Sequence, residues 1–167
     1  MAFLSSHFPC LCHDFLRILA ALAGGVGLAS LFTWGGSSEV GAISAARILL
    51  HNATLALLAL FLTHYGAVAM MMLNGFWLGM GLVASTAAVG LHTTFSLTVV
   101  HVPLEIAAWA MTIQGARLFW PTFLATVRKE RSWLHLVQKM GAVLAPATIF
   151  YILAALAEWA EHALAER

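Results

Sequence analysis

Charged side chains are scarce in this 167-residue chain, because only 9% of its residues are Asp, Glu, Lys or Arg while 62% are hydrophobic. The mean hydropathy is +0.90. A water-soluble domain of this size cannot cover so many apolar side chains with polar surface. The scarcity of charge therefore excludes a soluble globular domain and predicts an integral membrane protein. The small net charge of +1 gives no indication of a nucleic-acid partner.

The apolar runs lack the period-two alternation that is typical of membrane barrel strands, so the expected fold class is all-α and polytopic. A helix needs about 20 apolar residues to cross a bilayer core of about 30 Å. The sequence thus predicts about five transmembrane helices in one bundle, with 1–167 forming a single membrane domain. The expected spans are 15–34, 50–73, 75–92, 95–117 and 138–160. We expect a turn at His92-Thr93-Thr94, although one long helix over 79–100 is the alternative.

The first residues lack the basic region and small-residue cleavage site of a secretory signal, so the first span is expected to be retained. Five of the eight Lys and Arg residues, Arg117, Arg128, Lys129, Arg131 and Lys139, lie in the loop between the last two spans or at its ends. The positive-inside rule places this loop in the cytoplasm, and five crossings then place the N-terminus inside and the C-terminus outside. The loop segment 118–137 is either a plain loop with aromatic anchors or a basic amphipathic segment on the membrane surface.

Only one charged side chain, Glu105, lies between Arg47 and Arg117. An ionisable residue in a long apolar stretch is costly in lipid, so it should face a protein interior or a wet cavity. His101 is four residues earlier and shares the same helix face, and Pro103 suits the first turn of a helix. Glu105 is therefore either a cap for free N–H groups at a helix start or one wall of a polar pocket.

The second option predicts a pocket at one membrane face, because the second and fourth spans begin there and the fifth span ends there. The expected pocket residues are Asn52, His92, His101, Glu105 and Glu158. Such a pocket would bind a metal, a peptide terminus or a basic side chain of a partner. The H-E-x-x-H pattern of zinc hydrolases is absent, so the metal signal is weak and no cofactor is expected.

Only two cysteines are present, and both lie in the N-terminal run HFPCLCH. The weak metal-ligand candidates there are His7, Cys10, Cys12 and His13. The C-x-C spacing is tighter than that of common zinc sites, and cytoplasmic thiols should stay reduced. A different pattern, Asn74-Gly75 followed by Gly79, predicts a face of small residues that lets one helix approach another closely.

These motifs in order resemble a known family. Asn52, Gly66, LNGFWLG (73–79), HVPLE (101–105) and ILAALAEW (152–159) are similar to the motifs of the stage II sporulation protein M family of small polytopic membrane proteins. Val100 and Val102 stand where that family usually has Pro and Gly. The resemblance implies a bacterial cytoplasmic membrane protein that works with other membrane or envelope proteins, or with further copies of itself, in cell-envelope remodelling, bacteriocin export or immunity.

Two classes of function follow. The first is a non-enzymatic membrane subunit or scaffold whose polar pocket receives a partner, and the resemblance favours it. The second is an intramembrane enzyme, with or without a metal, that acts on a peptide or a lipid. Its candidate catalytic residues are His101, Glu105 and Glu158. A dry, hydrogen-bonded cluster of these side chains would favour the scaffold, and a water-filled cleft would favour the enzyme.

Overall fold

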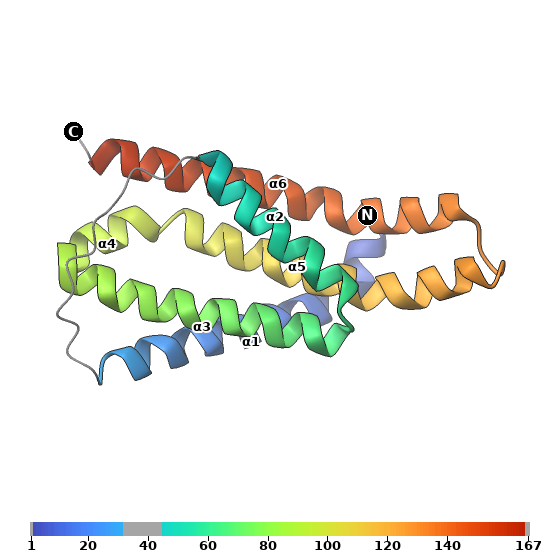
Figure 1. Cartoon of the computed structure of the whole chain (residues 1–167), viewed down its shortest axis with the longest axis horizontal. Coiled ribbons are helices and arrows are strands. Elements are labelled where there is room, and N and C mark those ends of the chain that lie inside the picture. The colour runs from blue at the N-terminus through green and yellow to red at the C-terminus, as the bar shows by residue number, and fades with distance from the viewer. Residues whose placement is uncertain (1, 32–44, 166–167) are drawn as a thin grey trace.

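Helices account for almost all of the protein in the computed structural model, which describes residues 2–31 and 45–165. In chain order they are α1 (Ala2–Ala29), α2 (Ala45–Phe61), α3 (His64–Val89), α4 (Leu91–Thr98), α5 (His101–Val127) and α6 (Trp133–Ala165). Helices α1, α3 and α6 run in one direction, and α2 and α5 run in the other (Figure 1). Helix α1 packs mainly on α3 and α5 mainly on α6, while α5 also contacts α1, α2 and α3. The described chain is all-α, as predicted.

Three helical segments are long and apolar enough to cross a membrane: Cys10–Ala29, His64–Val89 and Trp133–Glu161. Helices α4 and α5 would together form a fourth, bent by 48° at their junction. The apolar part of α2, Leu49–Phe61, is shorter than the length of about 20 residues that a bilayer core requires. The described residues are thus consistent with an integral membrane protein, whereas the predicted number of about five spans is not confirmed.

The predicted boundary at Asn74-Gly75 is wrong, because α3 runs through it without a break. The chain breaks earlier, at Leu62 and Thr63, inside the predicted span 50–73. Thr63 has extended backbone angles and its side chain accepts a hydrogen bond from the Gly66 backbone N–H at 3.4 Å, so it caps the start of α3. The sequence prediction placed a span boundary at the Asn74-Gly75 pair and overlooked the Thr63 cap.

The predicted turn at His92-Thr93-Thr94 is also wrong, because these residues lie inside α4. The turn before them is made by Gly90, whose φ of +87° is a conformation that suits glycine. Within α4 the Ser96 and Thr98 hydroxyls donate to the carbonyl oxygens four residues earlier, at 3.0 and 2.8 Å. Ser and Thr side chains that donate to the carbonyl oxygen four residues earlier are compatible with a helix, so their presence does not indicate a turn.

The predicted surface segment 118–137 is instead a helical hairpin. Helix α5 continues to Val127, residues 128–132 form the turn, and α6 begins at Trp133. The reason is aromatic packing along α5, where Phe119 stacks on Phe123 and Trp120 donates to the Phe61 carbonyl oxygen at 3.2 Å. The hairpin projects past the end of α2 and α3 (Figure 1), so its basic turn lies at the tip of the molecule.

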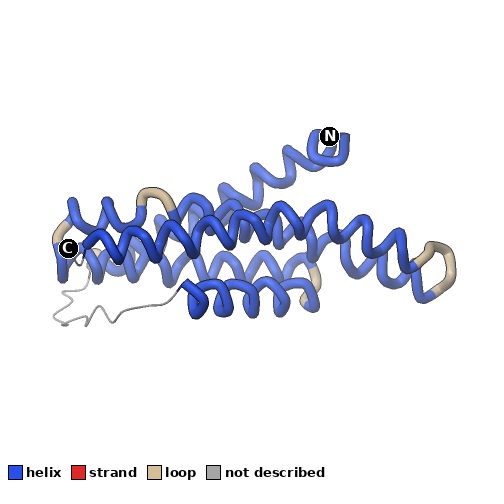
Figure 2. Tube along the Cα trace, turned by 90° about the horizontal axis from the view of Figure 1, so that it is seen from above, coloured by secondary structure: helices blue, strands red, loops and turns tan. Residues whose placement is uncertain are grey.

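Close contact between α1 and α3 depends on glycine. A Cβ on Gly79 would lie 2.2 Å from the Leu22 carbonyl oxygen, and one on Gly25 would lie 2.1 Å from the Phe76 carbonyl oxygen. A Cβ on Gly75 would meet Ile18 at 3.1 Å. The N-terminal part of α1 diverges from the other helices, as the view from above shows (Figure 2). The contact is therefore made by the C-terminal half of α1, where backbone meets backbone.

Replacing Gly79 by alanine should destabilise the protein, because the added methyl must push the two helices apart. Overpacking of this kind costs about 1–3 kcal/mol. The matched control is Gly81→Ala on the same helix, where a Cβ meets nothing within 4 Å. Thermal unfolding in detergent should show a lower midpoint for Gly79→Ala and an unchanged or higher one for Gly81→Ala. Equal midpoints would show that α1 and α3 do not meet at this glycine.

Candidate functional site

Polar side chains from three helices line one cavity of about 380 Å³, which we call the polar cavity. Its walls are Arg47, His51 and Asn52 from α2, Leu78 from α3, His101 and Glu105 from α5, and Glu158 from α6. The start of α2, the start of α5 and the end of α6 all lie at the same end of the molecule (Figure 1). Residues 53 positions apart in the sequence thus line the same polar cavity, because antiparallel helices return the chain to this end of the molecule.

Asn52 and Glu105 form the buried pair of the polar cavity. The Asn52 Nδ2 group donates to Glu105 Oε1 at 2.6 Å, and the two side chains are only 2% and 8% exposed. A carboxylate that accepts a hydrogen bond avoids part of the cost of its burial. Glu105 lies four residues after the start of α5 and makes no cap. The interpretation of Glu105 as a helix cap is therefore wrong.

The start of α5 is held by Glu161 of α6. Its Oε1 atom accepts from the Val100 backbone N–H at 3.3 Å, and its Oε2 atom lies 2.5 Å from His101 Nδ1. An ionised Glu161 offers only acceptors, so it pairs with the tautomer of His101 that carries its proton on Nδ1. The sequence analysis missed Glu161. The available signal was its position three residues after Glu158, which places both on one face of α6.

The remaining predicted pocket residue lies elsewhere. His92 is exposed on α4 and is not among the residues that line the polar cavity. A turn was predicted at His92, but this residue lies inside α4, which leads away from the start of α5. Asn74, predicted as a packing residue, is half-buried on α3, one residue before the buried Gly75 that faces Ile18 of α1.

The N-terminal metal candidates are spread along α1. Cys10 and Cys12 are both exposed free thiols, and residues two apart on a helix point to different sides. His13 is exposed as well, and the side chain of His7 lies outside the described residues. Within the described part of the chain, no three His, Cys, Asp or Glu side chains come together as a possible metal site.

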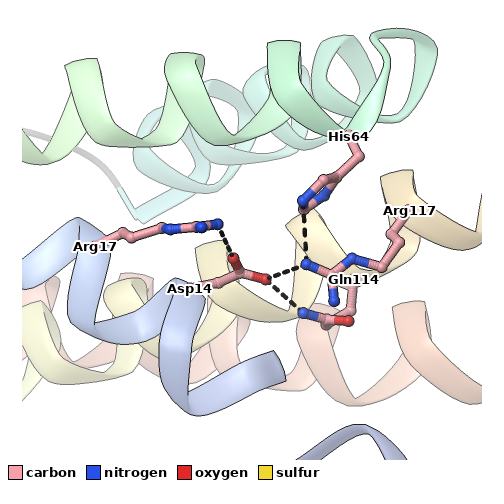
Figure 3. A network of polar contacts seen from close by, with 5 residues as sticks. All are labelled: Asp14, Arg17, His64, Gln114 and Arg117. Carbon is pink, nitrogen blue, oxygen red and sulfur yellow. Dashed lines mark hydrogen bonds and ion pairs between the residues drawn. The ribbon is translucent and has the colours of Figure 1, made fainter. Parts of the chain in front are cut away.

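A second polar cluster joins α1, α3 and α5 and was missed by the sequence analysis (Figure 3). At its centre is Asp14 of α1, which is 0% exposed. Its carboxylate accepts from Arg17 at 3.1 Å, from Gln114 Nε2 at 2.5 Å and from Arg117 at 3.3 Å. Asp14 lies inside the apolar segment Cys10–Ala29. Like Glu105, it is an ionisable residue in an apolar stretch and should therefore face a protein interior or a wet cavity. The prediction failed because the first span was expected to begin only at residue 15.

His64 completes this cluster, since Arg117 lies 3.1 Å from its Nε2 atom. An arginine only donates, so Nε2 accepts and the proton of a neutral ring is on Nδ1. Among the described residues, four buried side-chain atoms have no hydrogen-bond partner: His64 Nδ1, Thr94 Oγ1, Trp109 Nε1 and Gln114 Oε1. Such atoms are uncommon in folded proteins, and each one calls for an explanation.

Comparison with known proteins gives no relative. No family model, no curated protein and no solved structure matches this chain.

The Asn52–Glu105 pair should tolerate Glu105→Gln far better than Glu105→Leu. Glutamine keeps an acceptor for Asn52 Nδ2, whereas leucine leaves that buried group unpaired, at a cost of about 1–3 kcal/mol. Thermal unfolding in detergent measures the difference. The control is Asn52→Leu combined with Glu105→Leu, which removes both partners and should recover part of the loss. If Glu105→Gln and Glu105→Leu unfold at the same temperature, the hydrogen bond contributes nothing to stability.

Proposed function

We propose that this protein is a non-enzymatic integral membrane subunit that holds a partner protein or peptide at its polar cavity. The observation that carries the proposal is the meeting of Asn52, His101, Glu105 and Glu158 around one chamber at one end of the bundle. Asn52, Glu105 and His101 are held by hydrogen bonds to protein groups. A fixed polar chamber next to apolar helix surfaces is what a docking site for a partner requires.

The alternative, an intramembrane enzyme, is less well supported by the same contacts. A general base must reach the proton that it removes. Glu105 is engaged by Asn52, and His101 directs its Nδ1 proton to Glu161. The Asn52–Glu105 bond fits the hydrogen-bonded cluster expected of a scaffold, whereas a histidine whose Nδ1 faces a carboxylate is compatible with either class.

The resemblance of the sequence motifs to the stage II sporulation protein M family fits the same role. We propose that the chain acts as a scaffold or as a transport or immunity component of a bacterial cell-envelope complex. Of the positions that carry the resemblance, Asn52, Glu105, His101 and Glu158 meet at the polar cavity, while Gly75 and Gly79 lie against α1.

The proposed orientation places the α5–α6 hairpin in the cytoplasm. Its turn and flanks hold four of the eight Lys and Arg residues, Arg128, Lys129, Arg131 and Lys139, whereas Arg117 is paired with Asp14. The polar cavity and the carboxylates of Glu158 and Glu161 lie at the opposite end, which would face the outside. This arrangement follows the positive-inside rule.

Thiol labelling in intact cells tests the orientation. In a Cys10→Ser, Cys12→Ser background, a cysteine at Glu130 in the hairpin turn should resist a membrane-impermeant reagent. A cysteine at Ala160, an exposed residue near the end of α6, should react. Permeabilised cells provide the control, since both positions should then react. The reverse pattern would contradict the orientation and leave the cavity unchanged.

Cross-linking followed by purification in mild detergent tests the proposed role. A defined membrane or envelope protein should co-purify with the wild-type chain, and Glu158→Gln should reduce its yield at least tenfold, as expected for loss of a charged contact. The matched control is Glu130→Gln, which also removes one carboxylate but lies in the hairpin turn, far from the cavity. A chain that purifies alone under all conditions would contradict the scaffold.

A further inference from the structure

A cavity of about 500 Å³ lies between the end of α1, α3 and α4, and we call it the apolar cavity. Its wall consists mostly of apolar side chains, such as Leu82 and Phe95. Three further wall residues carry hydroxyl groups: Ser30, Thr86 and Thr98. Each of these hydroxyls donates to the carbonyl oxygen four residues earlier, at 2.8 Å. Their protons are therefore engaged within the protein and are not offered to a ligand.

Thr94 is the exception among the hydroxyl residues of the apolar cavity. It is 4% exposed, and its Oγ1 atom has no hydrogen-bond partner. Thr94 also lines a smaller cavity of about 250 Å³, whose wall includes the polar residues Ser85 and His101. A buried hydroxyl without a partner is unfavourable. Thr94 thus presents an unused hydrogen-bond donor where an apolar chamber borders a more polar one.

The position of Thr94 along α3 corresponds to the boundary between hydrocarbon and lipid head groups. Helix α3 has 26 residues and is about 39 Å long, whereas the hydrocarbon core of a bilayer is about 30 Å thick. Thr94 shares the apolar cavity with Leu82 and Thr86, which lie about two turns and one turn before the end of α3 at Val89. If α3 is centred in the bilayer, this level is where the ester groups of phospholipids lie.

The charges around the two cavities favour a neutral group beside Thr94. Among the described residues that line either cavity there is no Lys or Arg, and Glu158 lines the smaller one. The carboxylate of a free fatty acid would therefore lie in an apolar setting without a counter-charge, which is unfavourable. A neutral ester avoids this cost, and its carbonyl oxygen is an acceptor that matches a hydroxyl donor.

We propose that Thr94 Oγ1 donates a hydrogen bond to the ester carbonyl of a phospholipid whose acyl chain lies in the apolar cavity. The chain continues along the apolar wall formed by residues such as Leu82 and Phe95. The glycerol end lies toward the smaller cavity, which is the more polar of the two. The site takes a lipid and goes beyond the proposed function, which concerns a partner protein at the polar cavity.

The test compares two lipids that differ only in the proposed acceptor. These are dioleoyl phosphatidylcholine and its diether analogue, which has the same head group and chains but no ester carbonyl oxygens. Each lipid is titrated into the full-length protein in mild detergent, and native mass spectrometry measures the bound fraction. The wild-type protein should bind the ester lipid about fivefold more tightly, which is the value of one neutral hydrogen bond. Equal affinities would overturn the proposal.

Thr94→Val should lower the affinity for the ester lipid to that for the ether lipid, because valine has a similar shape and no hydroxyl. The matched control is Thr86→Val in the same cavity, where the hydroxyl already donates to the Leu82 carbonyl oxygen. This control should retain the preference for the ester. Loss of the preference in both variants would overturn the assignment of the contact to Thr94.

Thermal unfolding without lipid separates a ligand contact from a structural role. Thr94→Val should unfold at the same temperature as the wild type or higher, because an unpaired buried hydroxyl has been removed. A lower unfolding temperature with an unchanged lipid preference would mean that the hydroxyl serves the fold, for example by turning back to the Gly90 carbonyl oxygen. That result would overturn the proposal.

Oleate, the free acid of the same chain, provides the last comparison. It should not displace the ester lipid, because its carboxylate finds no counter-charge here. If oleate displaces the ester lipid from the wild type and Thr94→Val abolishes this, the site takes a fatty acid and the ester proposal fails. Neither Thr94 nor Thr86 is among the residues that line the polar cavity, so the proposed function does not depend on these outcomes.

Discussion

Burial of charge inside an apolar bundle is the constraint on which the rest of the structure depends. Each ionisable group within the helices needs a partner from another helix, since lipid offers none. Asp14 obtains its partners from Gln114 and Arg117, and Glu105 obtains its partner from Asn52. Both clusters draw on α5. Glu105 and Gln114 are nine residues apart on this helix, so the two polar layers are separated by about 14 Å along its axis.

Helix α5 is therefore the element around which the others are arranged. From Ala108 to Ala116 every residue of this helix is buried. Between the two polar layers, Thr112 and Tyr151 hydrogen-bond at 2.9 Å and join α5 to α6. The contact of α1 with α3 depends instead on the absence of side chains at Gly25 and Gly79. The bundle thus combines polar pairing around α5 with close backbone packing between α1 and α3.

The sequence was sufficient to predict the all-α fold class and four residues of the polar cavity, Asn52, His101, Glu105 and Glu158. Hydrophobic run length identifies membrane helices, and a lone carboxylate such as Glu105 marks a buried site. Helix boundaries were harder to predict. At Gly90 the turn depends on one residue's backbone conformation, while the Thr98 hydroxyl bonds back within α4. The partners of a buried charge were not predictable either, since Glu161 and Gln114 are recognised only when helices far apart in sequence meet.

The bend between α4 and α5 explains why the cavities lie where they do. If residues 91–127 formed one straight helix, α4 and its apolar face would continue along the axis of α5. The bend of 48° instead turns α4 aside at Val99–Val100, and the N–H group of Val100 is taken up by Glu161. The start of α5 is thereby tied to the end of α6, so these two helices form a fixed wall with His101 and Glu158 on it. On the α2 side of the polar cavity, His51 is exposed.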